Sequence, residues 1–283
     1  MVIVFNPRIF LRGRARDCQM KKLSIVMPVH DEEKRIGHTL DRYLGFFENA
    51  VKEGRLKEYE IIIVINNTID LTKKIVEEYQ KLNTPLYYLD LIPGGKGFAV
   101  LEGFKGSLYG NADYIGFVDA DCSTEPEEFL RLAEAIGKDD GVIASRYLPG
   151  AIVSPKQSFK RIVVSRVFNI LVRSLFFMNY RDTQCGAKIF KRNLIEKVIE
   201  KIGTTQWAFD IDLLYRIKCE GFKIKEEPTI WSDKLYSKLY LKKVGPKMAL
   251  AVFRLRLTNS KFKFIADFYD RLPKWLKIGH TLK

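Results

Sequence analysis

The chain has 283 residues, of which 47% are hydrophobic and 29% charged, and its formal net charge is +14. These proportions are typical of a folded globular protein and argue against a disordered or low-complexity chain. Four widely spaced cysteines and three histidines form no C-x-x-C pair and no cluster, which argues against a zinc site or a disulfide framework and indicates a reducing compartment. No apolar run approaches the roughly 20 residues that a spanning helix needs, and the arginine-rich N-terminus is not typical of a signal peptide.

The positive charge is concentrated in three segments. Residues 1–22 carry +5, residues 156–192 carry +8 and residues 234–266 carry +9, so the rest of the chain carries −8. Such a distribution predicts a basic face that meets an anionic partner, namely a phospholipid surface, a lipid phosphate or a nucleic acid. A face that is merely solvated is the alternative for each segment. Because no helix-turn-helix, zinc-finger or RNP-like pattern is present, we expect no nucleic-acid partner.

Strand and helix patterns alternate from Leu23 onward. Helical periodicity follows each apolar, strand-like run, and this order is typical of a parallel sheet that is covered on both faces. The sequence therefore predicts an α/β fold with a mostly parallel central sheet and helices on both sides. The strand-like runs are 23–27, 60–65, 86–91 and 114–118, and the helical runs are 40–47, 71–82, 98–110 and 126–136.

A polar cluster follows each of these strands. The clusters read PVHDEE, NNTID, GGKG and DAD. Because ligands of open parallel sheets bind outside the carboxyl ends of the strands, we expect the four clusters to converge in one site. The GGKG segment fits neither the dinucleotide fingerprint nor the P-loop spacing, which disfavours a hydride-transfer enzyme and a P-loop NTPase.

Asp119 and Asp121 stand two positions apart, directly after the last of these strands. Two such carboxylates can hold a hard divalent cation together with the phosphates of a substrate. The cation then neutralises charge on a diphosphate leaving group. A structural role is the alternative for this region, because Ser123 or Thr124 followed by Glu127 is a capping signal for the next helix. Both roles are compatible, since they concern different residues.

The ordered set of motifs resembles the family-2 glycosyltransferases of the GT-A fold. The resemblance runs from about Leu23 to Leu257 and is greatest for the polyprenyl-phosphate branch, within it for the dolichyl-phosphate glucosyltransferases more than for the dolichyl-phosphate mannose synthases. It implies transfer of a hexose, glucose favoured, from a nucleotide-diphosphate sugar to a polyprenyl or dolichyl phosphate with inversion. The motifs are PVHDEE, NNTID, GGKGFA, FVDAD, ASRY, RIVVS, DTQCGAKIFKR and WAFDIDLL.

The resemblance also implies a donor site with Mg²⁺ or Mn²⁺ as cofactor. Asp119 and Asp121 would hold the metal, with Ser123 beside it where the mannosyl branch tends to carry a glutamine. The chain departs from the family at Ile65-Asn66, which replaces a common Asp-Asp pair; Asn66 can still bind a base edge, but the identity of the base becomes open. The residues implied to bind the nucleotide sugar are Pro28, His30, Glu32, Asn66, Lys96, Asp119, Ala120 and Asp121.

The acceptor site is expected in the basic half. By resemblance, Arg146, Arg161 and Ser165 embrace the lipid phosphate, whose oxygens suit the arginine fork; a structural ion pair is the alternative for Arg146. Residues 159–178 form a helix on which Arg161, Ser165, Asn169 and Arg173 make a polar stripe. We expect this helix to lie in a membrane interface with its basic groups near the headgroups; a buried core helix is the alternative. Residues 246–257 suggest a second interfacial contact.

The expected acceptor determines the expected mechanism. A lipid phosphate is already anionic and needs no general base, so Asp210 is expected to orient the sugar or the acceptor, while Asp212 could equally be a helix-start carboxylate. The residues expected to carry catalysis are thus Asp119, Asp121, Arg146, Arg161 and Asp210. Two alternatives remain, a transferase for a hydroxyl acceptor with Asp210 as general base and a noncatalytic nucleotide-sugar-binding relative.

We expect the chain to divide into three parts. Residues 1–22 form a basic N-terminal segment, residues 23–233 the GT-A domain, and residues 234–283 a basic segment at the membrane interface. Together with the basic segments, this organisation predicts peripheral binding to an anionic surface, at the cytoplasmic face of a membrane.

Overall fold

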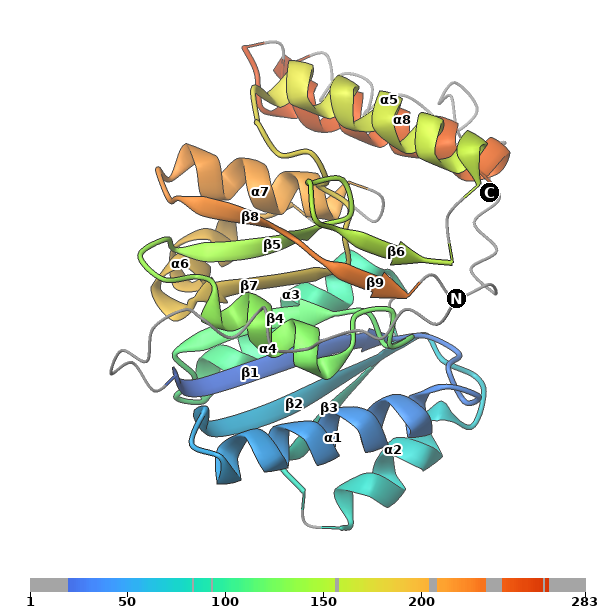
Figure 1. Ribbon diagram of the computed structural model, residues 1–283. Coiled ribbons are helices and arrows are strands. Elements are labelled where there is room, and N and C mark those ends of the chain that lie inside the picture. Colours follow the sequence, from blue (N-terminus) through green and yellow to red (C-terminus); the bar gives the residue numbers. More distant parts are fainter. Residues whose placement is uncertain are drawn as a thin grey trace, which may run out of the picture.

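A computed structural model gives the architecture of the protein (Figure 1). It describes residues 20–82, 84–92, 94–155, 158–203, 208–232, 241–261 and 263–264. The predicted basic N-terminal segment therefore lies almost wholly outside the described residues, as does much of the predicted C-terminal segment.

Among the described residues, seven strands form one twisted sheet in the order β3-β2-β1-β4-β7-β5-β8. The pairs β1–β2, β1–β4, β2–β3 and β5–β8 are parallel, whereas β7 runs antiparallel to both β4 and β5. The strands are β1 (Met20–Val29), β2 (Leu56–Asn66), β3 (Leu86–Leu91), β4 (Tyr114–Val118), β5 (Gly141–Ser145), β7 (Ala187–Lys191) and β8 (Ile224–Pro228).

Helices cover both faces of the sheet, as the sequence predicts. Helices α1, α2 and α4 pack on one face and α3, α6 and α7 on the other, while α5 and α8 lie side by side beyond α7 (Figure 1). The helices are α1 (Ile36–Lys52), α2 (Thr72–Gln80), α3 (Lys96–Tyr109), α4 (Pro126–Glu134), α5 (Phe159–Phe176), α6 (Arg192–Val198), the 3₁₀ turn η2 (Ile199–Lys201), α7 (Phe209–Cys219) and α8 (Leu241–Thr258).

The two cores follow from the alternation of side chains along the strands. Met27 and Ile63 pack against α1, whereas their neighbours Val26 and Val64 point to α3 on the opposite face. A strand that is buried on both faces has apolar residues at consecutive positions, which explains the continuous apolar runs of the sequence. Gly103 allows α3 to pack close to the sheet, since a Cβ there would come within 2.2 Å of Val26 Cγ1.

A second, two-stranded sheet lies beside the end of the main sheet where the polar clusters gather. It pairs β6 (Ile152–Ser154) with β9 (Ile230–Ser232) in parallel. The backbone N–H of Ser232 donates to the carbonyl of Ser123, 2.8 Å away, which fastens this small sheet to the segment after β4. Of the helices that the structure describes, none combines the length and the apolar character that crossing a bilayer requires.

Candidate active site

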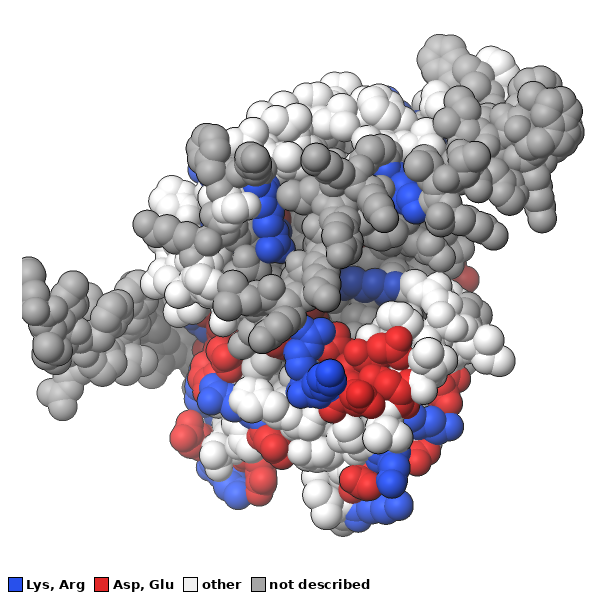
Figure 2. Space-filling model, turned by 90° about the vertical axis from the view of Figure 1, so that its right-hand side faces the viewer, with Lys and Arg blue, Asp and Glu red and all other residues white. Residues whose placement is uncertain are grey.

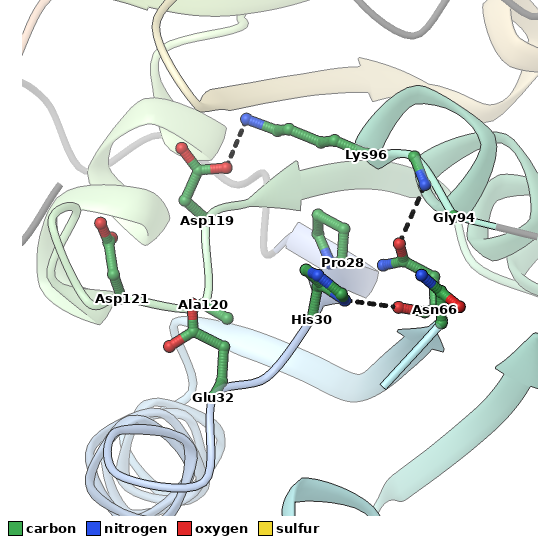
Figure 3. A pocket seen from close by; sticks show the side chains of 11 residues that line it. Pro28, His30, Glu32, Asn66, Gly94, Lys96, Asp119, Ala120 and Asp121 are labelled. Carbon is green, nitrogen blue, oxygen red and sulfur yellow. Dashed lines mark hydrogen bonds and ion pairs between the residues drawn. The ribbon is translucent and has the colours of Figure 1, made fainter. Parts of the chain in front are cut away.

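A cavity of about 500 Å³ opens at the carboxyl ends of β1, β2 and β4, next to the first turn of α3 (Figure 3). All eight residues that the resemblance assigns to the nucleotide sugar line it, so the strand-end clusters converge as expected. The cavity is lined by Pro28, His30, Glu32, Asn66, Asn67, Gly94, Gly95, Lys96, Asp119, Ala120 and Asp121.

Unusual backbone conformations also gather at this edge of the sheet. Asp31, Asn67 and Cys122 have φ angles of 50°, 47° and 56°, and they follow β1, β2 and β4 respectively. Non-glycine residues adopt this left-handed region rarely and at an energetic cost, and such residues cluster at functional sites. The chain therefore turns sharply after each of these three strands, next to the cavity.

The Asp119 carboxylate is held between a lysine and a glycine. Lys96 Nζ lies 2.5 Å from Asp119 Oδ1, as Figure 3 shows. On the other side, a Cβ at Gly186 would lie only 2.0 Å from Asp119 Oδ2, and the Gly186 carbonyl accepts a hydrogen bond from the Asp119 backbone N–H. Burial raises the pKa of Asp119; the Lys96 ammonium opposes this shift and the Asp121 carboxylate adds to it.

Asp121 belongs to the turn that leads into α4. Its Oδ1 accepts a hydrogen bond from the Ser123 backbone N–H at 2.9 Å, while the Ser123 side chain is buried and does not line the cavity. The capping signal predicted at Ser123 or Thr124 is wrong, because α4 begins after Glu125 with no side-chain cap. Pro126 at the first helical position shifts the start of the helix past the signal.

The oxygen atoms of Asp119 and Asp121 suit a hard divalent cation such as Mg²⁺ or Mn²⁺. Among the described residues, no three histidine, cysteine or acidic side chains are grouped closely enough to hold a metal by themselves. The Glu32 carboxylate, which also lines the cavity, makes two hydrogen bonds of 2.6 Å with Arg35. The two aspartates thus fit a cation whose remaining ligands come from water and from the phosphates of a substrate.

The sequence assigns binding of the base to Asn66, but in the structure the side chain of Asn66 is used within the protein and that of Asn67 is accessible. The Asn66 amide is buried: its Nδ2 donates to the Val29 carbonyl at 2.8 Å, and its Oδ1 accepts from the Gly95 N–H at 3.1 Å. This side chain therefore joins β1, β2 and the start of α3. Asn67 is exposed, lines the cavity and is the neighbour with an amide open to a ligand.

His30 and Glu32 complete the lower wall of the cavity in Figure 3. His30 Nδ1 lies 3.0 Å from the Asn66 carbonyl oxygen, which ties the loop after β1 to the end of β2. Burial raises the pKa of Glu32, although its ion pair with Arg35 acts in the opposite direction. On the face that Figure 2 shows, acidic side chains form a patch below the α5 and α8 region, with basic side chains around it.

Asp210 lies in the first turn of α7, next to the first turn of α3. The two helices can approach closely because Gly97 of α3 has no side chain: a Cβ there would lie only 2.5 Å from the Cβ of Phe209. Lys188 Nζ, which is fully buried, donates to Asp210 Oδ1 at 2.7 Å. Burial alone would lower the pKa of Lys96, but the carboxylates of Asp119 and Asp210 raise it, so Asp210 lies within electrostatic reach of the cavity.

Asp212 has a structural role, which is the alternative that the sequence left open. Its side chain is fully buried. Its Oδ2 accepts from the Gly203 N–H at 2.7 Å and its Oδ1 from Arg216 Nε at 3.1 Å. These bonds fix the start of α7. Asp210, the other acidic residue of this turn, is not among the residues that line the cavity and acts on it through its charge.

Arg146 forms a buried ion pair with Asp182. Its Nε and Nη2 donate to Asp182 at 2.7 and 3.0 Å, and its backbone N–H donates to the same carboxylate. Asp182 is fully buried and the Arg146 side chain is 11% exposed. The geometry thus favours the ion pair over the predicted phosphate clamp, because the bidentate pair occupies one edge of the guanidinium. The ring of Trp231 lies 5.2 Å from its Cζ.

Helix α5 is mixed: part of its polar stripe turns inward and several apolar side chains are exposed, while Arg173 of the stripe is exposed and Val172 and Phe176 are buried. Asn169 is buried and bonds to Thr183, while Ser165 Oγ lies 2.6 Å from the Tyr147 hydroxyl. Asn169 of the polar stripe thus faces the protein, and the helix is not fully buried, since Arg173 and several apolar side chains are exposed. The place of its basic groups near membrane headgroups stays a prediction. Arg161 is half-buried in the first turn. The exposed apolar side chains are Val163, Val164, Val167 and Ile170.

Comparison with known proteins identifies the family. The sequence profile "Glycosyl transferase family 2" matches residues 24–199, which is more than half of the chain. The chain belongs to this family. It is also 30% identical to a dolichyl-phosphate beta-glucosyltransferase of Dictyostelium discoideum, over 83% of this chain and 73% of that protein. The enzymes of the same name from Drosophila melanogaster and Homo sapiens are 31% and 30% identical over 79% of this chain and 71% of theirs.

Solved structures of GT-A glycosyltransferases share the fold. Glucosyl-3-phosphoglycerate synthase from Mycobacterium tuberculosis, crystallised with Mn²⁺, UDP and phosphoglyceric acid, superposes with a TM-score of 0.59 at 14% identity, covering 83% of this chain and 78% of that one. The mannosyltransferase PcManGT from Pyrobaculum calidifontis, in complex with GDP-Man and Mn²⁺, gives 0.58 at 16% identity, covering 89% and 71%. The predicted family and the predicted GT-A fold are both confirmed.

In this family-2 glycosyltransferase, sequence reasoning missed residues that act through their neighbours. Gly186 and Lys188 lie in the quoted motif DTQCGAKIFKR, but nothing in the motif links them to Asp119 and Asp210, which are far away in sequence. Asn67 stands directly beside the predicted Asn66. The sequence offered a signal for Asn67. Two successive asparagines at a strand end point in different directions, so if one is buried the other can face the cavity.

Proposed function

We propose that this family-2 glycosyltransferase transfers glucose from a nucleotide-diphosphate sugar to dolichyl phosphate or another polyprenyl phosphate. The observation that carries the proposal is helix α5, whose Ser165 and Asn169 bond to the loops beside the donor cavity while four of its apolar side chains are exposed. This arrangement suits an acceptor whose phosphate enters the protein and whose chain stays in a bilayer. The names of the relatives at 30% and 31% identity support the same acceptor and the same sugar.

The donor diphosphate is proposed to bind across Lys96 and the first turn of α3. Helix N-termini favour anions, and Gly95, with φ 132°, lets the backbone turn toward the cavity there. Asp119 and Asp121 would hold Mg²⁺ or Mn²⁺ with the phosphates; the cation supplies charge neutralisation for the leaving diphosphate. Lys96, whose Nζ lies 2.5 Å from Asp119 Oδ1, would add a second positive charge and stabilise the same developing charge.

The transfer itself needs one bond to form and one to break. An oxygen of the lipid phosphate forms a bond to the anomeric carbon of glucose from the face opposite the nucleotide, while the bond to the β-phosphate oxygen breaks and its electron pair stays on the diphosphate. The anomeric configuration is thereby inverted. No proton has to be removed from the acceptor, so the proposed role of Asp210 is to orient the sugar or the acceptor.

The acceptor phosphate is proposed to lie between the loop after β5 and the first turns of α5. Arg161 and Ser165 are in this region, and Ser165 Oγ already contacts the Tyr147 hydroxyl. Because β5 runs parallel to β4, Arg146 and Tyr147 follow their strand at the same sheet edge as Asp119. Arg146 would contribute indirectly, by holding the loop at Asp182, as well as through its positive charge.

The enzyme is proposed to bind peripherally to an anionic membrane, at its cytoplasmic face. On the face in Figure 2, the described part of the α5 and α8 region shows mostly uncharged side chains with a few basic ones among them. Leu250 and Phe253 of α8 are 46% and 47% exposed, and Arg254 follows them. Apolar side chains with neighbouring lysines and arginines are typical of helices that lie in the membrane interface.

The test is a transfer assay with dolichyl phosphate in detergent or vesicles and a panel that contains UDP-glucose, GDP-glucose, UDP-galactose and GDP-mannose. We expect lipid-linked glucose in the presence of Mg²⁺ or Mn²⁺ and none after chelation with EDTA. Transfer to a hydroxyl acceptor but not to dolichyl phosphate would refute the proposal and favour Asp210 as general base. Donor binding with no transfer would favour a noncatalytic relative.

A matched pair of arginines on α5 tests the acceptor site. Arg161→Ala should raise the KM for dolichyl phosphate about tenfold to a hundredfold, the effect of one lost charge-assisted phosphate contact. Arg173→Ala removes the same charge from the exposed last turns of the same helix. It should leave that KM close to the wild-type value. Equal effects of the two changes would mean that α5 attracts the acceptor only by its general charge.

A further inference from the structure

Lys188 is a buried lysine close to the donor cavity. Its side chain has no exposed surface, and its Nζ donates to Asp210 Oδ1 at 2.7 Å and to the Cys185 carbonyl at 2.6 Å. The Phe117 ring centroid lies 5.2 Å from the same Nζ. Burying an ammonium group is costly unless it is paired and hydrogen-bonded, so these contacts are what allows a lysine at this position.

The Lys188–Asp210 pair is part of a larger arrangement of charges. Lys96 Nζ lies 5.7 Å from the centroid of the same Phe117 ring and pairs with Asp119. Two ammonium groups thus share the ring of Phe117, and each holds one carboxylate, one from the D-x-D motif and one from the first turn of α7. The Asp210 charge raises the pKa of both Lys96 and Asp119. Lys188 is therefore connected to the donor site through a single residue.

The fold by itself does not require a charge at position 188. A buried ion pair is often no more stable than apolar residues of the same volume, and Asp210 in the first turn of a helix is already stabilised by the helix dipole. What Lys188 adds is geometry. With Oδ1 fixed at 2.7 Å from a fully buried ammonium, the plane of the Asp210 carboxylate and the direction of Oδ2 are fixed as well.

We infer that Lys188 is a positioning residue, which holds the Asp210 carboxylate in the orientation that the transfer reaction uses. The inference rests on the proposed function only in taking Asp210 as the group that orients the sugar or the acceptor. Lys188 itself does not line the cavity and has no exposed surface with which to touch a substrate. Its effect on catalysis therefore passes through Asp210.

A double-mutant cycle tests this connection. The variants are Lys188→Met, Asp210→Asn and the combination of both, and the transfer assay measures kcat and the KM for the nucleotide sugar. Lys188→Met should lower kcat by about 100-fold, the size of effect that a misplaced catalytic group produces. It should leave the KM for the nucleotide sugar near the wild-type value. Asp210→Asn should have a similar effect, and the double variant should lose no more than Asp210→Asn alone, because both changes remove the same interaction.

Thermal unfolding of the same variants separates positioning from folding. Each single change leaves one buried charge without its partner and should lower the Tm, while the double variant should recover most of that loss. We thus expect the double variant to have a Tm near that of the wild type but a kcat as low as that of Asp210→Asn. Lys201→Met is the control; it breaks another lysine–carboxylate pair, with Glu220 at 2.7 Å, on the protein surface, and should change neither kcat nor Tm appreciably.

Several outcomes overturn the inference. Wild-type kcat in Lys188→Met would do so, and so would losses that multiply in the double variant, or activity that returns together with the Tm. If the wild type transfers sugar to a different acceptor, the proposed function fails, but the cycle is measured with that acceptor and still decides the role of Lys188. A chain that transfers nothing would refute both.

Discussion

Gly186→Ala tests the construction of the D-x-D site with the addition of a single methyl group. The new Cβ would lie 2.0 Å from Asp119 Oδ2, 2.4 Å from its Cγ and 3.0 Å from its Oδ1, whereas ordinary contact begins at 3.4 Å. The carboxylate therefore has to move by more than 1 Å, which breaks its 2.5 Å contact with Lys96. Since a displacement of about 1 Å at a reacting centre can cost 100-fold in rate, we expect kcat to fall by at least that factor.

The assay is transfer of glucose to dolichyl phosphate, measured over a range of Mn²⁺ concentrations, with circular dichroism to verify the fold. Higher Mn²⁺ should restore part of the activity if the displaced carboxylate still reaches the metal. Gly45→Ala is the matched control, because its Cβ would meet nothing within 4 Å and alanine favours a helix interior by about 0.5–1 kcal/mol. A folded Gly186→Ala enzyme with wild-type kcat would refute the idea that close packing at Gly186 holds Asp119 in its active position.

Three further outcomes are expected. Val167→Glu combined with Ile170→Glu should reduce co-sedimentation with phosphatidylserine-containing vesicles even in high salt, since each side chain contributes about 1.5–3 kcal/mol when fully buried in an apolar phase; unchanged binding would exclude this face of α5 from the membrane. Asn66→Ala should lower the free energy of unfolding by about 1–3 kcal/mol, because it removes two hydrogen bonds. An unchanged free energy of unfolding in a denaturant titration would contradict this. Burial raises the pKa of Asp182, but Arg146 outweighs it and holds that pKa below its ordinary value. The ion pair therefore stabilises the fold above about pH 4. Asp182→Asn should lower the free energy of unfolding by about 3–5 kcal/mol at pH 7 and by progressively less in acid. Urea unfolding at several pH values measures this trend.

The donor site was predictable because its residues follow parallel strands. Once the alternation of strands and helices is recognised, the carboxyl ends of β1, β2 and β4 must share one edge, and the polar residues after them must meet. Pro28, Lys96 and Asp119 are far apart in sequence and line one cavity for this reason. The continuous apolar runs also predicted the doubly covered sheet.

The acceptor side was less predictable because its contacts depend on β7. This strand runs antiparallel between β4 and β5, an insertion that the hydrophobic pattern does not reveal. It brings Asp182 to Arg146, and this pairing decides between a phosphate clamp and an ion pair. The orientation of α5 was likewise hidden, since periodicity separates Asn169 from Val167 but does not say which of the two packs against the protein.

The segment that enters β7 forms a common wall between the two halves of the site. Within five residues it provides Asp182 for Arg146, Thr183 for Asn169 of α5, and Gly186 for Asp119. A chimeric enzyme that exchanged this segment to recognise a new acceptor would therefore also disturb its own use of the donor. Redesign of acceptor choice has more freedom on the first turns of α5, whose side chains can be varied without altering the backbone against which Asp119 rests.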